Sequence, residues 1–460
     1  MTLRRAPSDS LVVVLVALVA RLAVVLWAGS AIPPTADGSY YDVVARRIAE
    51  GHGYTWLWPD GAVTYAAHYP VGYPALVAGM YALFGARPVL AMVLNAVAGT
   101  AAVFAGYRLL ARATSRRLAL LGGLAFALHP ALVPYTAALM TEGMTAALLV
   151  VATATAARAR DAAERGDSRS RWRWLALTGL VMGLVTLVRP QSLAYGPVLG
   201  LLAATPKERL AVRGLAAVLV TALTFAVCAP WTVRNCVRME RCALVSVNGG
   251  WNLAIGTQTT NGAWQEMKVP EACKEVFAEA AKDACFGHEA VHVIEADPLA
   301  WLARVPAKMR ATFDYFGAAP WYLHQANATR FPYGAKVALG TVETLASRLL
   351  LAAALVAVLK FPGPRKRARI VIAALGLAAC VVVPGTVGYL ACAAAILLLG
   401  PRALARAPVI LPATAATILL TAATHAVFFG AGRYGLVVVP FVTLLAFVRA
   451  TPEESAPRHG

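Results

Sequence analysis

The feature that most constrains this chain is a series of long apolar runs separated by short basic clusters. Hydrophobic residues make up 59% of the 460 residues and charged residues only 14%, and the mean hydropathy is +0.63. Soluble domains rarely have this composition, whereas polytopic membrane proteins commonly do. Because about 20 apolar residues cross the hydrocarbon core as a helix, the sequence predicts an all-α membrane protein.

The basic residues gather between the apolar runs rather than along one polar face. Such clusters mark the cytoplasmic loops of membrane proteins, so the net charge of +19 indicates contact with membrane lipids and no nucleic-acid partner. We expect every cluster to face the cytoplasm. The clusters lie at residues 112–117, 158–173, 207–213, 360–369 and 402–406.

Apolar length and the side of each basic cluster together predict about twelve spans, with both termini in the cytoplasm. The first run is interpreted as an uncleaved span rather than a signal peptide, because it is too long and Arg21 interrupts it. Residues 73–84 are interpreted as re-entrant or interfacial, because a crossing there would put the arginines at 112–117 outside. The predicted spans are 11–32, 88–111, 118–135, 139–157, 174–188, 192–204, 214–233, 336–359, 370–384, 387–400, 408–428 and 434–448.

Two polar stretches lie between predicted spans on the side away from the basic clusters. They divide the chain into an N-terminal transmembrane module, 1–234, with a first outer loop at 33–69; an extracytoplasmic loop or cap, 235–335; and C-terminal transmembrane helices, 336–460. Within the cap, residues 270–314 are predicted to form two helices. Any polar chemistry is therefore expected on the outer face of the membrane.

The seven cysteines show no spacing typical of a metal site. Four fall in the predicted outer loop, where disulfides persist, and four cysteines allow three pairings. We expect Cys273 and Cys285 to staple the first helix of the cap. The other two outer cysteines are Cys236 and Cys242, and the cysteines in apolar runs, expected to be packing residues, are Cys228, Cys380 and Cys392.

The first outer loop carries the strongest local pattern. Tyr41, Val44 and Ile48 follow helical spacing and Gly51 follows as a stop, which predicts a short amphipathic helix on the interface. Asp37 lies just ahead of this helix. It can cap the helix, or it can act as a general base on a hydroxyl or amine.

Asp37 at the end of the first span, the pair Tyr40-Tyr41, and the run His68-Tyr69-Pro70 form a pattern that resembles a known superfamily. It is that of the GT-C glycosyltransferases, specifically the bacterial relatives of protein O-mannosyltransferases (family 39) and the aminoarabinose transferases. The resemblance covers essentially the whole chain. Further matching stretches are Arg189-Pro190, Pro230 to Asn235, Asn248 to Gly256 and Gly432-Arg433-Tyr434.

The resemblance implies a GT-C-like bundle with extracytoplasmic interfacial helices and loops, in a bacterial inner membrane. It implies a membrane glycosyltransferase that moves a sugar from a polyprenyl phosphate to a glycan, lipid or protein acceptor outside the cell, with inversion. Asp37 matches the family's general base, and Glu142 matches a recurrent acid. Many relatives carry a second acid where this chain has Gly38. No organic cofactor is implied, and a divalent metal is a candidate partner of the acids.

The phosphate of such a donor requires cations at the outer surface. Arg189, Arg234 and Arg433 are predicted at outer span ends, against the positive-inside trend. Each alone can extend its charge to lipid headgroups, but three together favour a phosphate site, with Arg433 first. The residues predicted to line the substrate cavity are Tyr40, Tyr41, His68, Tyr69, Asn248, Trp251, Asn252 and Tyr434.

Two other functions share this architecture. A transporter or flippase for polyprenyl-linked glycans requires paired half-helices and polar residues at the bilayer midplane, whereas the predicted spans 214–233 and 408–428 carry few polar residues beyond threonine. A ligase that moves whole glycan chains is not separated from a glycosyltransferase by topology. The sequence names neither the sugar nor the acceptor.

Overall fold

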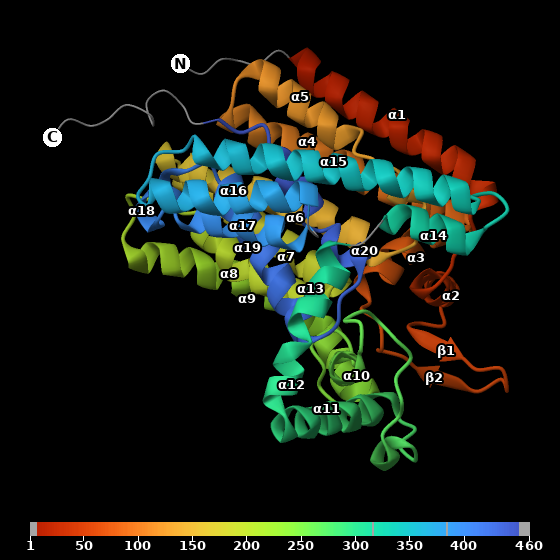
Figure 1. Cartoon of the computed structure of the whole chain (residues 1–460). Helices are drawn as coiled ribbons and strands as arrows, with labels where there is room; N and C mark the ends of the chain where they lie inside the picture. The colour runs from red at the N-terminus through yellow and green to blue at the C-terminus, as the bar shows by residue number, and fades with distance from the viewer. Residues whose placement is uncertain (1–6, 315–316, 383–384, 450–460) are drawn as a thin grey trace, which may run out of the picture.

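Long helices lie side by side in the computed structural model, which describes residues 7–314, 317–382 and 385–449 (Figure 1). A helix satisfies its backbone hydrogen bonds within itself, as a segment in hydrocarbon must. The bundle helices are α1 (Pro7–Ala31), α4 (Pro88–Ala113), α5 (Arg116–Ala127), α6 (Thr141–Glu164), α7 (Ser168–Val188), α8 (Tyr195–Leu202), α9 (Leu210–Arg238), α15 (Tyr333–Leu359), α16 (Lys366–Val382), α17 (Thr386–Leu397), α18 (Pro401–Arg406), α19 (Ile410–Val427), α20 (Gly432–Gly435) and α21 (Val439–Leu445).

The predicted all-α polytopic membrane fold is confirmed. Among the residues that the structure describes, six helices are long and apolar enough to cross a membrane: α1, α4, α7, α9, α15 and α19. The predicted spans 118–135, 192–204, 387–400 and 434–448 instead contain the shorter helices α5, α8, α17 and α21, none longer than 12 residues. Proline accounts for two of these short helices, since Pro130 follows the end of α5 and Pro440 sits in the first turn of α21.

The basic clusters meet at one end of the bundle. An ion pair joins the end of α4 to that of α6 (Arg112–Asp161, 2.7 Å), and another joins α5 to the start of α1 (Arg116–Asp9, 2.6 Å). In Figure 1, α18 lies at this end, whereas α2, α3 and α14 lie at the opposite end of the long helices. The grouping is the one that cytoplasmic loops require.

The opposite end carries the elements of the two loops that the sequence predicts to be outside. Helix α3 has 13 residues, which rise about 20 Å and so fall short of a hydrocarbon core of about 30 Å. Its start is pressed against the end of α7, since a Cβ on Gly72 would lie 2.6 Å from the backbone of Leu187. The outer elements are α2 (Asp37–Ala49), β1 (Thr55–Leu57), β2 (Val63–Tyr65), α3 (Gly72–Phe84), η1 (Pro134–Ala137), η2 (Pro190–Ala194), α10 (Gly249–Gln258), η3 (Glu271–Cys273), α11 (Glu279–Ala296), α12 (Pro298–Ala303), α13 (Val305–Phe313) and α14 (Ala318–Ala326).

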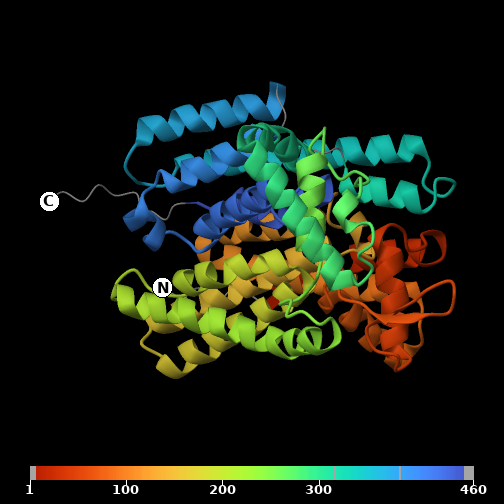
Figure 2. The same ribbon diagram turned by 90° about the horizontal axis from the view of Figure 1, so that it is seen from below.

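Helices α10 to α13 form the cap, which Figure 2 shows in front of the bundle. The expectation of two helices in residues 270–314 was wrong, because the first long helix, α11, runs unbroken through the expected boundary to Ala296. Asp297 then caps a new helix by accepting a bond from the backbone N–H of Ala300, and Pro298 occupies its first turn. A third helix, α13, returns the chain to the bundle.

Two disulfides are present: Cys236–Cys242 closes the turn after α9, and Cys273–Cys285 lies in the cap. The second ties η3 to α11, as expected for the staple. Because Cys228, Cys380 and Cys392 are free and buried, we expect three alkylatable thiols in denatured, unreduced protein and seven after reduction. Intact-mass measurement after maleimide labelling checks this count, and seven thiols without reductant would contradict both bridges.

Candidate active site

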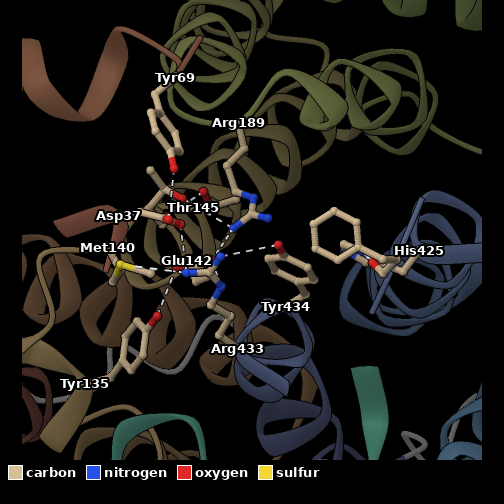
Figure 3. Close-up of polar contacts among 12 residues, drawn as sticks. Asp37, Tyr69, Tyr135, Met140, Glu142, Thr145, Arg189, His425, Arg433 and Tyr434 are labelled. Carbon is tan, nitrogen blue, oxygen red and sulfur yellow. Dashed lines mark hydrogen bonds and ion pairs between the residues drawn. The ribbon is translucent and has the colours of Figure 1, made fainter. Parts of the chain in front are cut away.

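Four charged side chains meet at the end of the bundle opposite the basic clusters (Figure 3). The guanidinium of Arg433 lies between two acids, with Nη1 2.8 Å from Oδ2 of Asp37 and Nε 3.4 Å from Oε1 of Glu142. The same Oε1 of Glu142 lies 2.8 Å from Nη1 of Arg189. The acids and the arginines therefore alternate in one chain of ion pairs: Asp37, Arg433, Glu142, Arg189.

The ends of four helices supply these residues. Asp37 is the first residue of α2 and Glu142 lies in the first turn of α6, where the partial positive charge of a helix N-terminus favours an acid. Arg189 directly follows α7, because Pro190 disfavours helical backbone in the residue before it, and Arg189 is extended (φ −145°, ψ 109°). Arg433 lies in the short helix α20.

The segment that carries Arg433 is held by the cap. Lys308 of α13 is fully buried, and its ammonium donates to the carbonyls of Ala426 and Val427 at the end of α19 (both 3.2 Å). The backbone N–H of Gly430 donates to the carbonyl of Gly262 (2.8 Å). A cation at a helix C-terminus satisfies carbonyls that have no partner in the helix, so Lys308 fixes where the chain turns towards Arg433.

Tyrosines surround the charged chain. Tyr69 donates its hydroxyl to Oδ1 of Asp37 (3.0 Å), and Tyr135 donates to Oε2 of Glu142 (3.0 Å). The ring of Tyr434 lies under both arginines, 4.8 Å from the guanidinium carbon of Arg189 and 5.3 Å from that of Arg433. Burial, and then the charge of Asp37, raises the pKa of Tyr69 well above its ordinary value. Tyr69 therefore stays protonated and remains a donor to Asp37.

The two acids differ in access. The side chain of Asp37 is 25% exposed, whereas that of Glu142 is 2% exposed. Of the two interpretations of Asp37, the cap is the one that the geometry does not support, because α2 has no side-chain cap and its N-cap residue is Ala36. Asp37 is therefore accessible to a substrate, whereas Glu142 is buried and forms ion pairs with both arginines.

The structure leaves no room for a larger side chain at Gly38, the position where the family resemblance led us to consider a second acid. A Cβ at this position would lie 2.8 Å from the carbonyl oxygen of Leu139 and 2.8 Å from the hydroxyl oxygen of Tyr322. That hydroxyl accepts bonds from the backbone N–H groups of Leu139 (3.2 Å) and Thr35 (3.4 Å). The second carboxylate near Asp37 is therefore Glu142, from another helix.

The pair does not form a metal-ligand set. Asp37 and Glu142 flank a guanidinium instead of converging on one point. Divalent cations take several oxygen ligands around one centre, and residues 7–314, 317–382 and 385–449 hold no group of three or more His, Cys, Asp or Glu side chains with that arrangement. The positive charge between the two acids comes from Arg433.

A cavity of about 1080 Å³ lies between the first outer loop and the cap. Tyr69 lines it, so the residue that bonds Asp37 forms part of its wall. Figure 1 shows the hairpin of β1 and β2 beside α10 and α11. The hairpin lines one side of the cavity, and these two helices line the other. Of the predicted cavity residues, it gathers Tyr40, His68, Tyr69 and Trp251.

The remaining predicted cavity residues are placed elsewhere. Tyr41 is buried with its ring against Tyr69 and Tyr73, and Tyr434 lies under the arginines. Asn248 accepts a bond from the hydroxyl of Ser246 (2.9 Å), and Asn252 lies in the first turns of α10. None of these four side chains lines the large cavity, so their contact with a substrate stays a prediction.

Arg234 is not brought to the charged chain. Its guanidinium donates to the carbonyls of Ala66 (2.9 Å) and Tyr54 (2.8 Å) and lies 4.6 Å from the ring of Trp231. It therefore ties the first outer loop to the end of α9. The sequence placed Arg234 on the correct end of its helix, but contacts with residues 168 and 180 positions away leave no local signal.

His68 lies between the rings of Tyr69 (4.9 Å) and Trp251 (5.4 Å). Burial lowers the pKa of His68 to about 4, although Asp37 acts in the opposite direction. The imidazole is therefore neutral near pH 7 and is not a cation for a phosphate. It remains a hydrogen-bonding group in the cavity wall.

The fold and the site together define a polytopic membrane protein whose helical bundle resembles that of the GT-C glycosyltransferases. Residues 68–233 match the family model described as dolichyl-phosphate-mannose-protein mannosyltransferase. The resemblance to GT-C glycosyltransferases is thus confirmed for the fold and for this segment. No curated protein sequence matches the chain.

The fold is supported by the structure of one protein, and another protein is more distantly similar. The apo oligosaccharyltransferase of Archaeoglobus fulgidus superposes with a TM-score of 0.50 at 12% identity, covering 95% of this chain and 50% of that one. The chain thus spans about half the length of that protein. The same protein tethered with an acceptor peptide gives 0.50 and 12%, covering 96% and 49%. ArnT from Cupriavidus metallidurans bound to undecaprenyl phosphate gives 0.44 at 17% identity, covering 96% and 77%.

Proposed function

We propose that this protein is an inverting membrane glycosyltransferase, which moves a monosaccharide from a polyprenyl-phosphate donor to an acceptor outside the membrane. One observation carries the proposal: a reachable carboxylate, Asp37, and two partly buried arginines belong to a single chain of ion pairs. A base for the acceptor and cations for a leaving phosphate are the two requirements of this transfer. The family match at residues 68–233 supports the same chemistry.

The acceptor reaches Asp37 from the cavity. Tyr69 lines the cavity and donates to Oδ1 of Asp37, so an acceptor hydroxyl that enters there arrives next to the carboxylate. Asp37 removes the hydroxyl proton as the oxygen attacks the anomeric carbon, while Tyr69 orients the carboxylate.

The donor phosphate lies on the other side of the chain of ion pairs. Arg189 and Tyr434 line a second, small cavity with polar side chains of α6, η2 and α19, among them Thr145, Ser192 and His425. Arginine forms paired hydrogen bonds with phosphate oxygens. Arg189, which lines this cavity, and Arg433, which shares Glu142 with it, therefore hold the leaving group between them. Base and leaving phosphate then face opposite sides of the sugar, which is the arrangement for inversion.

Arg433 has a double role in this scheme. Before the donor binds, its Nη1 neutralises Asp37 at 2.8 Å. The phosphodiester monoanion of the donor competes for the same guanidinium, and when it draws Arg433 away, Asp37 is released to act as a base. Glu142, buried and bonded by Tyr135, is a positioning residue that keeps both arginines in place.

The proposed orientation places the basic end of the bundle in the cytoplasm and the site outside, in a bacterial inner membrane. The ion-paired arginines at residues 112–117 and 158–173 then follow the positive-inside trend. Arg189 and Arg433 are exceptions to it, and both have a carboxylate partner.

The test is transfer by purified protein in nanodiscs. A panel of synthetic undecaprenyl-phosphate monosaccharides is incubated with outer-envelope acceptors, and release of undecaprenyl phosphate and the anomeric configuration of the product are measured by mass spectrometry and NMR. Transfer with inversion is expected. Retention of configuration, or movement of intact donor across a vesicle membrane without cleavage, would overturn the proposal in favour of another mechanism or a flippase.

Replacing His68 by Gln is expected to leave the shape of the pH–rate profile unchanged between about pH 5 and 8. The reason is that the imidazole, with a pKa of about 4, is already neutral over this range. The measurement is the initial transfer rate of both proteins across that range. Loss of a titration step near pH 6 in the variant would show that His68 changes charge during catalysis.

A further inference from the structure

The large cavity has a charge opposite to that of the chain. Two acids on the hairpin and its neighbouring loop, Asp60 and Glu240, and two on α11, Glu279 and Asp283, line it against only Arg238 and Lys282. The whole chain has a net charge of +19. His68 adds no charge, because burial lowers its pKa to about 4. Acids thus outnumber bases in the cavity, although the protein as a whole is strongly cationic. The cavity therefore disfavours an anionic ligand.

Aromatic rings form the walls. Trp56 of β1 stacks on Tyr40 of α2, with centroids 4.7 Å apart and planes 10° from parallel. Across the cavity, Trp251 of α10 packs edge-on against His68 at 5.4 Å. Flat rings offer a rigid apolar face, which suits the C–H face of a sugar ring.

The acids of α11 hold the walls in position. Glu279 accepts a bond from the backbone N–H of Ala67 (2.7 Å), and Asp283 accepts one from that of Trp251 (2.8 Å). A carboxylate has about four lone-pair sites, so both can also accept bonds from hydroxyl groups in the cavity. Ring faces and carboxylate acceptors together match the two faces of a carbohydrate.

We propose that this cavity is the acceptor site and that the acceptor is a neutral or amino-bearing oligosaccharide. The inference rests on the proposed function, since Tyr69 connects the cavity to Asp37. A hydroxyl of the terminal sugar lies against Tyr69, and the following sugars stack on Trp56. Phosphorylated or carboxylated glycans are disfavoured, because four acids line the cavity against two cations.

The test uses the full-length protein in nanodiscs on an array of neutral, amino-bearing and phosphorylated oligosaccharides and Ser/Thr peptides. Binding is expected for the first two classes. Trp56→Ala should weaken it at least about tenfold, since a stacking face is lost, whereas Trp264→Ala, an exposed tryptophan outside the cavity, should not. Binding only to peptides or phosphorylated glycans, or to none of the array, would overturn the proposal.

Two further variants separate this proposal from the proposed function. Asp37→Asn should lose transfer yet keep oligosaccharide binding, so a failure of catalysis does not hide the acceptor site. Asp60→Lys combined with Glu240→Lys changes two exposed residues at the rim and should admit phosphorylated oligosaccharides that the unchanged protein rejects. Unaltered rejection by this correctly folded variant would contradict the electrostatic part of the proposal.

Discussion

Replacing Asp37 by Asn is expected to reduce sugar transfer by about 10²- to 10⁴-fold, the range that a general base contributes. The amide keeps the size of the carboxylate and can still accept the bond from Tyr69, but it cannot take the acceptor's proton. The loss should appear in kcat, because neither the cavity wall nor the two arginines are changed. Initial rates of undecaprenyl-phosphate release at saturating donor measure it.

The matched control is Asp42→Asn, five residues further along the same helix. Asp42 is buried and bonded to Arg46 and Tyr81, away from the chain of ion pairs. Its loss should lower thermal stability with transfer per folded molecule maintained. Equal transfer by Asp37→Asn and the unchanged protein would remove Asp37 from the reaction.

The sequence identified the charged members of the site because their position was unusual. An ionisable residue near membrane depth needs a partner, and arginines on the outer side run against the topology trend. Asp37, Glu142, Arg189 and Arg433 all satisfy one of these conditions, and the structure brings the four together. The order of ion pairs along them was not predictable, because it depends on the ends of four different helices.

Arg234 shows the limit of this reasoning. It met the same condition as Arg189, yet its partners are the carbonyls of the first outer loop. Topology gives the side of the membrane on which a residue lies but not its neighbour. The same limit hid the wall of the cavity, where Glu279 bonds Ala67 across 212 positions and no periodic pattern connects the two segments.

The bundle was predicted well where apolar runs are long and less well where proline divides them. Helices α1, α4 and α15 lie close to their predicted spans. Residues 118–135 read as one apolar run, but α5 ends at Ala127, before His129 and Pro130, and the chain continues as turns into η1. A hydropathy profile does not show such a break, because proline interrupts the hydrogen bonds of the backbone and not the run of apolar side chains.

Replacing Arg433 by Ala is expected to lower kcat for transfer by about 10²- to 10³-fold, the cost of removing one donor to developing charge on a leaving group. Arg189 stays 2.8 Å from Glu142, so the buried acid keeps a cation and the fold should persist. Arg433→Lys should recover part of the loss, because lysine restores the charge without the paired hydrogen bonds. Rates with a single donor at saturating and limiting concentration separate kcat from KM.

The control for this variant is Arg87→Ala. Arg87 directly precedes α4, is exposed, and donates to the carbonyl of Phe84 (3.3 Å). It therefore tests whether any arginine near this end assists the donor through the lipid surface. If Arg87→Ala and Arg433→Ala lowered transfer equally, a general attraction of anionic headgroups would explain the effect. A loss confined to Arg433→Ala, with both a lower kcat and a raised donor KM, ties the guanidinium to the donor phosphate, because Arg433 contacts that phosphate in the bound donor and in the transition state.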